Sequence, residues 1–289
     1  MKVAITGITG FIGQNLAAFL TANGHQVIAL TRADFQLGVT AIAAKIAGTD
    51  AVVNLAGAPV VKRWSPSYKD EILLGRVSVS RMLAEAIINC PSEARPPVVL
   101  SASAIGIYDD EKVHNESSTH FGTGFLADVC RQWEAAIRPV VEAEVRLCII
   151  RIGLVLGKNG GALPKLLPIF KAGLGGKLGN GRQGFSFIHI DDFCRAALFL
   201  LSRNESSGVY NFVSPHFTTN YGFTKALARV VKRPAWFAVP AFALKMLYGE
   251  GAVTLLGGQF VEPGRIVAEG FRFDYSDIQY ALASIVRNP

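Results

Sequence analysis

The sequence has few cysteines, little charge and no long apolar run. Its four cysteines, Cys90, Cys130, Cys148 and Cys194, stand apart without CxxC or Cys/His spacing, which argues against a disulfide scaffold and against a metal site. No stretch approaches the ~18 uninterrupted apolar residues of a membrane-spanning helix. The first apolar run stops at Gly7, before it reaches the length of a signal-peptide core. These absences predict a cytoplasmic protein with no bound metal and no membrane partner.

What the sequence does contain is apolar residues and an excess of basic charge. Half of its 289 residues are hydrophobic and 18% are charged, which is the composition of a folded globular chain. Twenty-nine Lys and Arg against 22 Asp and Glu give a net charge of +7. Because the basic residues are spread along the chain, the charge favours an anionic small-molecule ligand and not a nucleic acid.

Short apolar runs alternate with helical patterns along the chain. The runs cover 2–6, 26–30, 51–55, 98–101, 146–150 and 209–213, and the helical patterns cover about 11–23, 39–48, 66–89, 124–138, 162–172 and 191–203. Continuous apolar runs are typical of parallel strands that are buried on both faces. The alternation predicts an α/β fold: a doubly wound parallel sheet of the Rossmann type with a smaller, partly helical C-terminal lobe.

A glycine motif joins the first predicted strand to the first predicted helix, in the segment Gly7-Ile8-Thr9-Gly10-Phe11-Ile12-Gly13. Gly7 allows a tight turn, Gly10 lets the backbone approach a pyrophosphate, and Gly13 lets the helix pack closely on the strand. The pyrophosphate would then lie at the helix N-terminus. We therefore assign residues 1–157 plus about 189–213 to a dinucleotide-binding domain, and about 158–188 and 214–289 to a substrate-side lobe.

The end of the second strand bears on the choice between NAD(H) and NADP(H). The strand ends at Leu30-Thr31-Arg32, and an arginine there can pair with the 2′-phosphate of NADP(H). The alternatives are that Arg32 is a solvated charge, or that Asp34 curls back to bind the ribose of NAD(H). We predict NADP(H), with NAD(H) as the alternative.

Polar side chains lie within the apolar stripe of helix 66–89. Arg76 and Ser80 fall in the middle of the face that carries Ile72 and Leu83. An unpaired buried guanidinium is costly, so Arg76 either reaches the cofactor or a buried carboxylate, or bends past the stripe into water.

Together these residues resemble the extended short-chain dehydrogenase/reductase superfamily, in its NAD-dependent epimerase/dehydratase branch that ends in a short C-terminal domain of unknown role. The resemblance covers almost the whole chain. Its motifs are the glycine segment 7–13, Asn54-Leu55-Ala56-Gly57, Lys62-Arg63-Trp64, Glu71 with Arg76, Ser101-Ala-Ser103-Ala-Ile-Gly106, Gly124-Phe125-Leu126 with Trp133-Glu134, Arg151-Ile-Gly153-Leu-Val-Leu-Gly157, Ile188-His189-Ile190-Asp191-Asp192 and Glu269-Gly270-Phe271-Arg272-Phe273.

The resemblance implies a set of cofactor contacts at the matching positions. They are Gly7, Thr9, Gly10, Phe11, Ile12, Gly13, Thr31, Arg32, Leu55, Ala56, Gly57, Glu71, Arg76, Ser101, Leu126 and Arg151. It also implies that Ser103 is the catalytic Ser/Thr that binds a substrate oxygen. Glu71 lies opposite the apolar face of its helix, which leaves its contact with a cofactor in question.

The superfamily's catalytic Tyr–Lys couple is missing from helix 124–138. Leu126 and Cys130 stand at its two positions, and neither can serve as its acid or base. Cys130 is either a nucleophile with a stabilised thiolate or a buried small hydrophobe. Where the family usually has Gly-Tyr-Tyr-Gly, this chain keeps only Tyr108. The catalytic candidates are therefore Ser103, Tyr108 and Cys130.

A glycine-rich segment and two histidines are further candidates for functional roles. In the glycine-rich segment 173–184, Lys177 and Arg182 could hold a substrate phosphate, or the segment could be a flexible surface loop. His189 precedes Asp191, which we expect to cap the next helix, so a structural hydrogen bond is favoured over acid–base catalysis. His114 is expected to lie in a solvated loop.

The predicted function is that of an NADP(H)-binding oxidoreductase or epimerase that acts on a small polar or nucleotide-linked substrate. The alternative is a catalytically weak or inactive NADP(H)-binding sensor or scaffold, because such a protein needs the glycine motif but no proton relay. The sequence is compatible with a homodimer.

Overall fold

The computed structural model describes residues 1–287, and its elements follow the expected alternation. The sheet strands and the elements between them are β1 (Lys2–Thr6), α1 (Phe11–Ala22), β2 (Gln26–Leu30), α2 (Arg32–Gln36), α3 (Val39–Ile46), β3 (Ala51–Asn54), α4 (Pro66–Ile88), β4 (Val98–Ala104), β5 (Val113–His114), α5 (Phe125–Ile137), β6 (Arg146–Ile152), β7 (Leu154–Leu156), α7 (Ile190–Ser202) and β11 (Gly208–Phe212). The remaining elements are α6 (Leu163–Lys171), β8 (Gly176–Leu178), β9 (Gly184–Phe185), β10 (Phe187–His189), β12 (Thr218–Thr219), α8 (Asn220–Val231), β13 (Phe237–Val239), α9 (Ala241–Tyr248), α10 (Val253–Leu256), β14 (Phe260–Val261), α11 (Gly264–Ala268) and α12 (Ile278–Arg287).

The central sheet has six parallel strands in the order β11-β6-β4-β3-β1-β2. The six apolar runs of the sequence all lie in these strands, which confirms the predicted doubly wound parallel sheet. The chain adds β2 on one side of β1 and all later sheet strands on the other. Ligands of such sheets bind beyond the carboxyl ends of the strands where this reversal occurs. The expected site therefore lies beyond the ends of β1 and β3.

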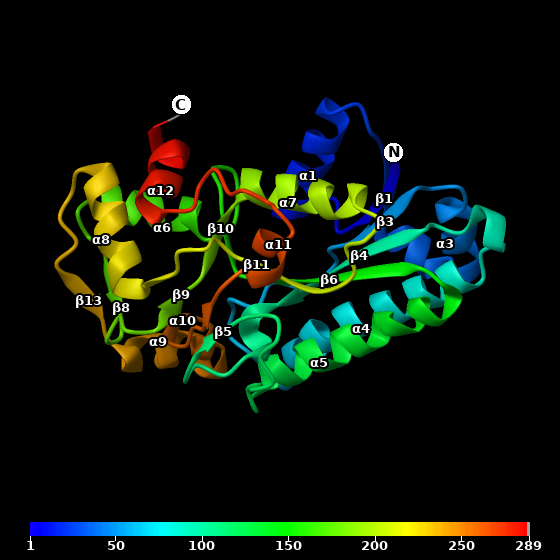
Figure 1. Cartoon of the computed structure of the whole chain (residues 1–289). Helices are drawn as coiled ribbons and strands as arrows, with labels where there is room; N and C mark the ends of the chain where they lie inside the picture. Colours follow the sequence, from blue (N-terminus) through cyan, green and yellow to red (C-terminus); the bar gives the residue numbers. More distant parts are fainter. Residues whose placement is uncertain (288–289) are drawn as a thin grey trace.

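Helices cover both faces of the sheet (Figure 1). On one face α1 and α7 contribute Leu16, Leu20 and Phe193 to a buried cluster with strand residues such as Val3 and Ile5. On the other face α3 and α4 lie against the strands, and α5 packs beside α4. Because successive strand residues point to opposite faces, each strand contributes to both clusters.

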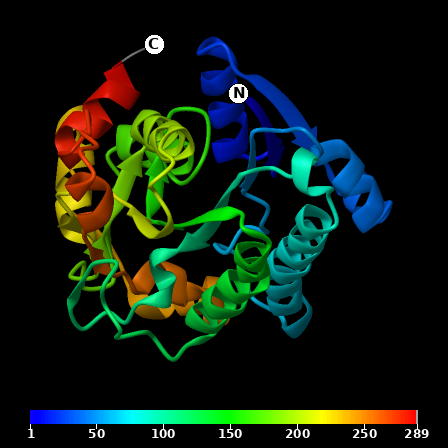
Figure 2. The same cartoon turned by 45° about the vertical axis from the view of Figure 1, so that its right-hand side comes forward.

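The C-terminal lobe is built around three helices, α6, α8 and α12, which share a separate buried cluster. The short pairs β8 with β13 and β9 with β12 lie within this lobe, whereas the pair of β5 with β14 connects it to a loop of the first domain. Figure 2 shows α8 and α12 on the opposite side of the molecule from α2 and α3. The division at 157, 189 and 213 remains a prediction. Within residues 1–287, no helix combines the length and the apolar character that a membrane crossing requires.

Candidate functional site

The turn between β1 and α1 can be formed only by glycine at two positions. Gly7 has φ +66°, and a Cβ on it would lie 2.7 Å from the carbonyl oxygen of Leu55. A Cβ on Gly13 would lie 2.3 Å from the carbonyl oxygen of Gly7. Gly10 is the N-cap of α1, and no side chain caps the helix there. The first turn of α1 thus presents its backbone N–H groups beside the end of β3, as a pyrophosphate requires.

The loop after β7 lies against the first residue of α1. Cβ atoms on Gly157 or Gly160 would lie 2.6 Å and 2.3 Å from the Phe11 ring. Phe11 therefore packs under a backbone that has no side chains at these positions. This contact places the 157–161 loop beside the glycine turn.

Buried polar groups hold the chain that leaves β3. The Thr6 hydroxyl donates to Asn54 Oδ1 at 2.8 Å and accepts from the backbone N–H groups of Leu55 and Ala56 at 3.0 and 3.1 Å. Asn54 Nδ2 donates to Ser80 Oγ at 2.9 Å, and to Ser101 Oγ at 3.3 Å. This network explains why Ser80 stands in an apolar helical face. Ser101, predicted to contact the cofactor, is buried within it.

The charges after β2 differ in how they are satisfied. The Asp34 carboxylate accepts from the backbone N–H and the hydroxyl of Thr31, and it pairs with Lys45 at 2.7 Å. The hydrogen bond from Lys45 and those from Thr31 lower the pKa of Asp34 to about 2. Asp34 therefore forms a capping box with Thr31, the N-cap of the short helix α2, which the sequence pattern did not predict. Arg32 is exposed and makes no ion pair or side-chain hydrogen bond with any residue of the described chain.

Arg76 is a half-buried residue of α4. It has no carboxylate partner among the described residues. Its guanidinium donates to the carbonyl oxygens of Ile72 at 3.0 Å and Ala58 at 2.8 Å. It lies 5.1 Å from the centre of the Trp133 ring. Burial lowers the pKa of Arg76. Of the three expectations, a bond to a buried carboxylate is excluded for residues 1–287, whereas contact with the cofactor and contact with water stay predictions.

Trp133, beside Arg76, carries a hydrogen-bond donor that has no acceptor in the described chain. Its side chain is buried, and its indole N–H has no hydrogen-bond partner within the described part of the chain. Such orphaned donors are rare in folded proteins and call for an explanation. A guanidinium without an anion next to a buried donor without an acceptor fits a site for an anionic, acceptor-rich ligand.

Ser103 and Tyr108 belong to one buried network around an ion pair. Arg151 donates to both carboxylate oxygens of Glu134, at 2.8 and 2.9 Å, and to the Tyr108 hydroxyl at 2.9 Å. The Ser103 hydroxyl donates to Glu134 at 2.8 Å, and the Tyr108 hydroxyl donates to Asn211 at 3.0 Å. Ser103 and Tyr108 are each 1% exposed.

This network leaves little scope for proton transfer to a ligand. Burial raises the pKa of the Tyr108 hydroxyl, so it is a weaker acid than an ordinary tyrosine. Burial by itself would lower the pKa of Arg151, but the Glu134 carboxylate raises it above the ordinary value. Arg151, predicted to contact the cofactor, is instead enclosed by Glu134 and Tyr108. The catalytic roles of Ser103 and Tyr108 stay predictions that this geometry does not favour.

The two positions of the missing couple lie on α5 as expected. Cys130 is buried, and Leu126 is half-buried against Gly106. Burial, followed by the nearby Glu134 charge, raises the pKa of Cys130 to about 11. A thiol with that pKa carries almost no thiolate at neutral pH. Of the two hypotheses for Cys130, the structure supports a small buried hydrophobe and not an activated nucleophile.

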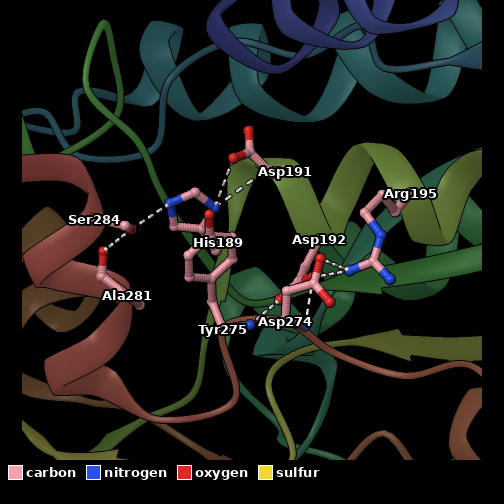
Figure 3. Close-up of polar contacts among 8 residues, drawn as sticks. All are labelled: His189, Asp191, Asp192, Arg195, Asp274, Tyr275, Ala281 and Ser284. Atoms are coloured by element: carbon pink, nitrogen blue, oxygen red, sulfur yellow. Dashed lines mark hydrogen bonds and ion pairs between the residues drawn. The ribbon is translucent and has the colours of Figure 1, made fainter. Parts of the chain in front are cut away.

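His189 is structural, and it corrects the expected helix cap (Figure 3). His189, not Asp191, is the N-cap of α7: its Nδ1 accepts from the backbone N–H of Asp191 at 3.1 Å. Its Nε2 lies 3.2 Å from Ser284 Oγ, whose proton goes to the carbonyl of Ala281 at 2.8 Å. Nε2 must therefore donate, which assigns a neutral ring. Burial lowers the pKa of His189 and favours the same state.

The expectation for His114 was wrong. His114 is buried, its Nε2 lies 3.0 Å from Asp109 Oδ1, and its ring stacks on Tyr108 at 4.8 Å. The pairing of β5 with β14 explains its burial, because the loop that carries it joins the C-terminal lobe. Across the part of the chain that the structure describes, no group of three or more His, Cys, Asp or Glu side chains could hold a metal.

The remaining predicted residues lie at the surface or in the C-terminal lobe. Thr9, Glu71 and Arg182 are exposed. Gly57 lies against the Arg76 guanidinium. Lys177 belongs to β8, so its segment is ordered structure and not a free loop, and its ammonium lies 6.0 Å from the Tyr221 ring centre. Nothing in their geometry brings Lys177 or Arg182 to the glycine turn.

The comparisons with known proteins agree with this architecture. The model of the NAD dependent epimerase/dehydratase family matches residues 3–212, and the domain of unknown function DUF1731 matches residues 239–285. The chain is 41% identical to the chloroplastic SDR39U1 homolog of Arabidopsis thaliana, an epimerase family protein, over 99% of this chain and 87% of that one. It is 33% identical to the epimerase family protein YfhF of Bacillus subtilis, over 99% and 98%.

Two solved structures are similar over nearly the whole chain. The human epimerase family protein SDR39U1, solved with NADPH, has a TM-score of 0.91 at 31% identity and covers 100% of both chains. A nucleoside-diphosphate sugar epimerase from Corynebacterium glutamicum has a TM-score of 0.80 at 32% identity, over 99% of this chain and 58% of that one. The chain therefore belongs to the NAD dependent epimerase/dehydratase family and carries the DUF1731 domain near its C-terminus.

Proposed function

We propose that the protein binds NADPH beyond the carboxyl ends of β1 and β3 and prefers it to NADH. The observation that carries the preference is the contrast after β2, where Arg32 is exposed without a partner and Asp34 is engaged by Thr31 and Lys45. Arg32 would hold the 2′-phosphate, and the first turn of α1 would hold the pyrophosphate. The similar human structure with NADPH supports this assignment.

For the chemistry, we propose an NADP(H)-dependent oxidoreductase and not a nucleotide-sugar epimerase. Bound NADPH supplies a hydride. An epimerase must also remove and return a hydroxyl proton, and assistance of that kind contributes about 10²–10⁴ in rate. Ser103 and Tyr108 are buried in the Glu134–Arg151 network, and the Cys130 thiol has a pKa of about 11. No side chain among these three is free to carry that proton.

This limitation selects a class of substrate. A simple ketone becomes an alkoxide on reduction and needs an acid beside it, whereas a quinone or a conjugated carbonyl forms a delocalised anion that water can protonate later. The Arg76 guanidinium, which has no anion of its own in residues 1–287, could stabilise such a charge. We therefore propose small polar acceptors of this conjugated class.

A second function is favoured by the same observation. If Ser103, Tyr108 and Cys130 serve only the fold, the protein is an NADPH-binding sensor or scaffold that needs no turnover. The glycine turn has the geometry that a pyrophosphate needs, and Leu126 and Cys130 stand at the two positions of the missing Tyr–Lys couple.

NADPH consumption separates the two functions. Purified protein is assayed against quinones, conjugated carbonyls, simple aldehydes and nucleotide sugars, beside the variant Gly10→Asp. Aspartate is a good N-cap, so this variant keeps α1 while its carboxylate takes the place of the pyrophosphate. Turnover restricted to conjugated acceptors and lost in the variant supports the oxidoreductase. Tight NADPH binding without turnover supports the sensor, and epimerase turnover that survives Ser103→Ala with Tyr108→Phe contradicts both.

A further inference from the structure

The net charge of the chain is confined to one part of it. Residues 158–188 and 214–289 carry 13 Lys and Arg against 5 Asp and Glu, a net charge of +8, whereas the rest carries 16 against 17, a net charge of −1. From residue 206 to residue 249 there are five basic residues and no acidic one. The cofactor site therefore does not account for the basic charge, because the part of the chain that contains it is nearly neutral.

Four of these cations line one groove on the outer side of α8. Lys225, Arg229, Lys232 and Arg233 surround a space of about 470 Å³ together with Tyr221 and Trp236. The spacing along the helix puts them on one side, while Phe223, Leu227 and Val230 bury the other in the lobe. None of the four makes an ion pair or a side-chain hydrogen bond within residues 1–287. We call this groove and its six named residues the basic-aromatic face.

Aromatic and apolar side chains stand out beside the cations. Trp236 is 88% exposed and Phe237, the next residue, is 55% exposed. Isolated exposed hydrophobics need no explanation, but two adjacent exposed aromatic rings beside a group of cations do.

We propose that the basic-aromatic face, with Phe237, binds the surface of an anionic lipid bilayer. Clusters of four or more Lys and Arg attract anionic headgroups, and tryptophan favours the boundary between headgroups and acyl chains. A single-stranded nucleic acid would also meet cations and aromatic rings, and the experiments below distinguish it from a bilayer. A second copy would bring another basic face against this one, which charge repulsion opposes. The expectation of no membrane partner was based on the lack of a long apolar run. A peripheral contact needs no such run, so the proposal revises that expectation.

Vesicle flotation of the full chain tests the proposal. The protein should float with vesicles of phosphatidylcholine and phosphatidylglycerol, should stay behind with phosphatidylcholine alone, and should be released by high salt. Because each cation near such a surface contributes about 1 kcal/mol, loss of one should lower the partition coefficient about fivefold. The variant Lys232→Glu with Arg233→Glu should therefore lower it at least ~25-fold.

A matched control keeps the change in net charge and moves it elsewhere. Arg81→Glu with Arg138→Glu alters two exposed cations, one on α4 and one just after α5, which make no ion pair with any residue of the described chain. This variant should float like the unaltered protein. NADPH binding by every variant shows that it is folded, and because the inference does not rest on the proposed function, either can fail alone.

Trp236 supplies an independent readout. Its emission should shift to the blue on addition of anionic vesicles, and the shift should vanish in Trp236→Phe, since Trp64 and Trp133 remain in that variant. Trp236→Ala with Phe237→Ala should weaken flotation. The proposal is overturned if anionic vesicles do not bind, if the matched control loses as much binding as the charge reversal, or if Trp236 stays in water. Binding of an oligonucleotide without vesicle binding, or self-association that buries Trp236, also overturns it.

Discussion

Two arginines at the candidate site, Arg151 and Arg76, are satisfied in opposite ways. Arg151 forms a bidentate pair with Glu134 and donates to Tyr108, and its pKa rises above the ordinary value. Arg76 meets only two backbone carbonyls and the Trp133 ring, and burial lowers its pKa. The first cation is complete within the folded chain. The second has no anionic partner within residues 1–287, and we propose that a bound ligand supplies one.

This difference separates a residue of the fold from a residue of the site. A buried ion pair whose partners satisfy each other is weak evidence for function, whereas a desolvated cation without a counter-charge costs stability unless a ligand compensates it. The pair at Arg151 also engages the hydroxyls of Ser103 and Tyr108, a geometry that does not favour these two catalytic candidates. Substitutions at the two arginines should therefore give opposite results.

The largest effect is expected from breaking the complete pair. Glu134→Gln keeps the shape of the side chain but leaves Arg151 as an uncompensated buried cation. Removing one partner of a buried pair costs about 3–5 kcal/mol, and urea unfolding should show a loss of that size in the free energy of unfolding. Glu134→Leu with Arg151→Met should recover most of it, because the double variant removes both charges. A loss below about 1 kcal/mol for Glu134→Gln would contradict the structural role of the pair.

Arg76→Met should show the reverse pattern. Unfolding free energy should change by less than about 1 kcal/mol, because the cation has no carboxylate to lose. NADPH affinity should fall about 10- to 100-fold, the range of a lost hydrogen bond to a charged group of about 1.5–3 kcal/mol. Tryptophan fluorescence and thermal unfolding with and without NADPH would measure both quantities. Arg76→Lys keeps the charge and should retain part of the affinity. A destabilised variant with unchanged NADPH affinity would make Arg76 a second structural arginine.

Arg32→Ala sharpens the contrast with a cation that is exposed. The affinity for NADPH should fall about tenfold, because a charge-assisted hydrogen bond that is exposed to water is weaker than a buried one. NADH affinity should stay nearly unchanged, since NADH has no 2′-phosphate. Parallel titrations by fluorescence give the ratio, with Arg32→Lys as the charge-preserving control. Equal affinities for the two cofactors in the unaltered protein would remove the basis for an NADP(H) preference.

Strand and helix positions follow from the sequence, because they depend on local periodicity. The six expected sheet strands and six expected helices all occur, and Ser65 caps α4 as its position before Pro66 suggests. The glycine turn was equally predictable, since its backbone admits no Cβ at Gly7 or Gly13. These features need only short-range information.

The polar partners could not be predicted, because they join segments far apart in the chain. Glu134 appeared only as a motif residue, although it pairs with Arg151 on a different element and accepts a hydrogen bond from the Ser103 hydroxyl. His114 was expected in water and is buried by the pairing of β5 with β14. The signal that could have pointed to the network is the presence of a Glu and an Arg at otherwise apolar positions of α5 and β6, but spacing alone does not show which side chains meet.

The smallest effect concerns His189, a buried titratable group that the fold satisfies by keeping it neutral. The ring accepts from Asp191 N–H, donates to Ser284, and stacks on Tyr275 at 3.9 Å. Its pKa is lower in the folded state than the ordinary ~6.5 of an unfolded chain. The unfolded state then binds more protons between these two values, so stability is complete above pH ~6.5 and falls as the pH drops below it.

The loss between pH 7.5 and pH 5.5 should not exceed about 1.4 kcal/mol, because about one pH unit of this range lies below the unfolded-state pKa and each unit corresponds to 1.36 kcal/mol. His189→Asn keeps a good helix N-cap and should flatten the curve over this range. Asp192, whose pKa burial raises, titrates on the acid side and is shared by both proteins, so the difference between the two curves isolates the imidazole. If the two proteins lose stability in parallel, His189 already carries a proton in the folded state. Its Nδ1 could then not accept from Asp191, and the assignment of a neutral cap would be wrong.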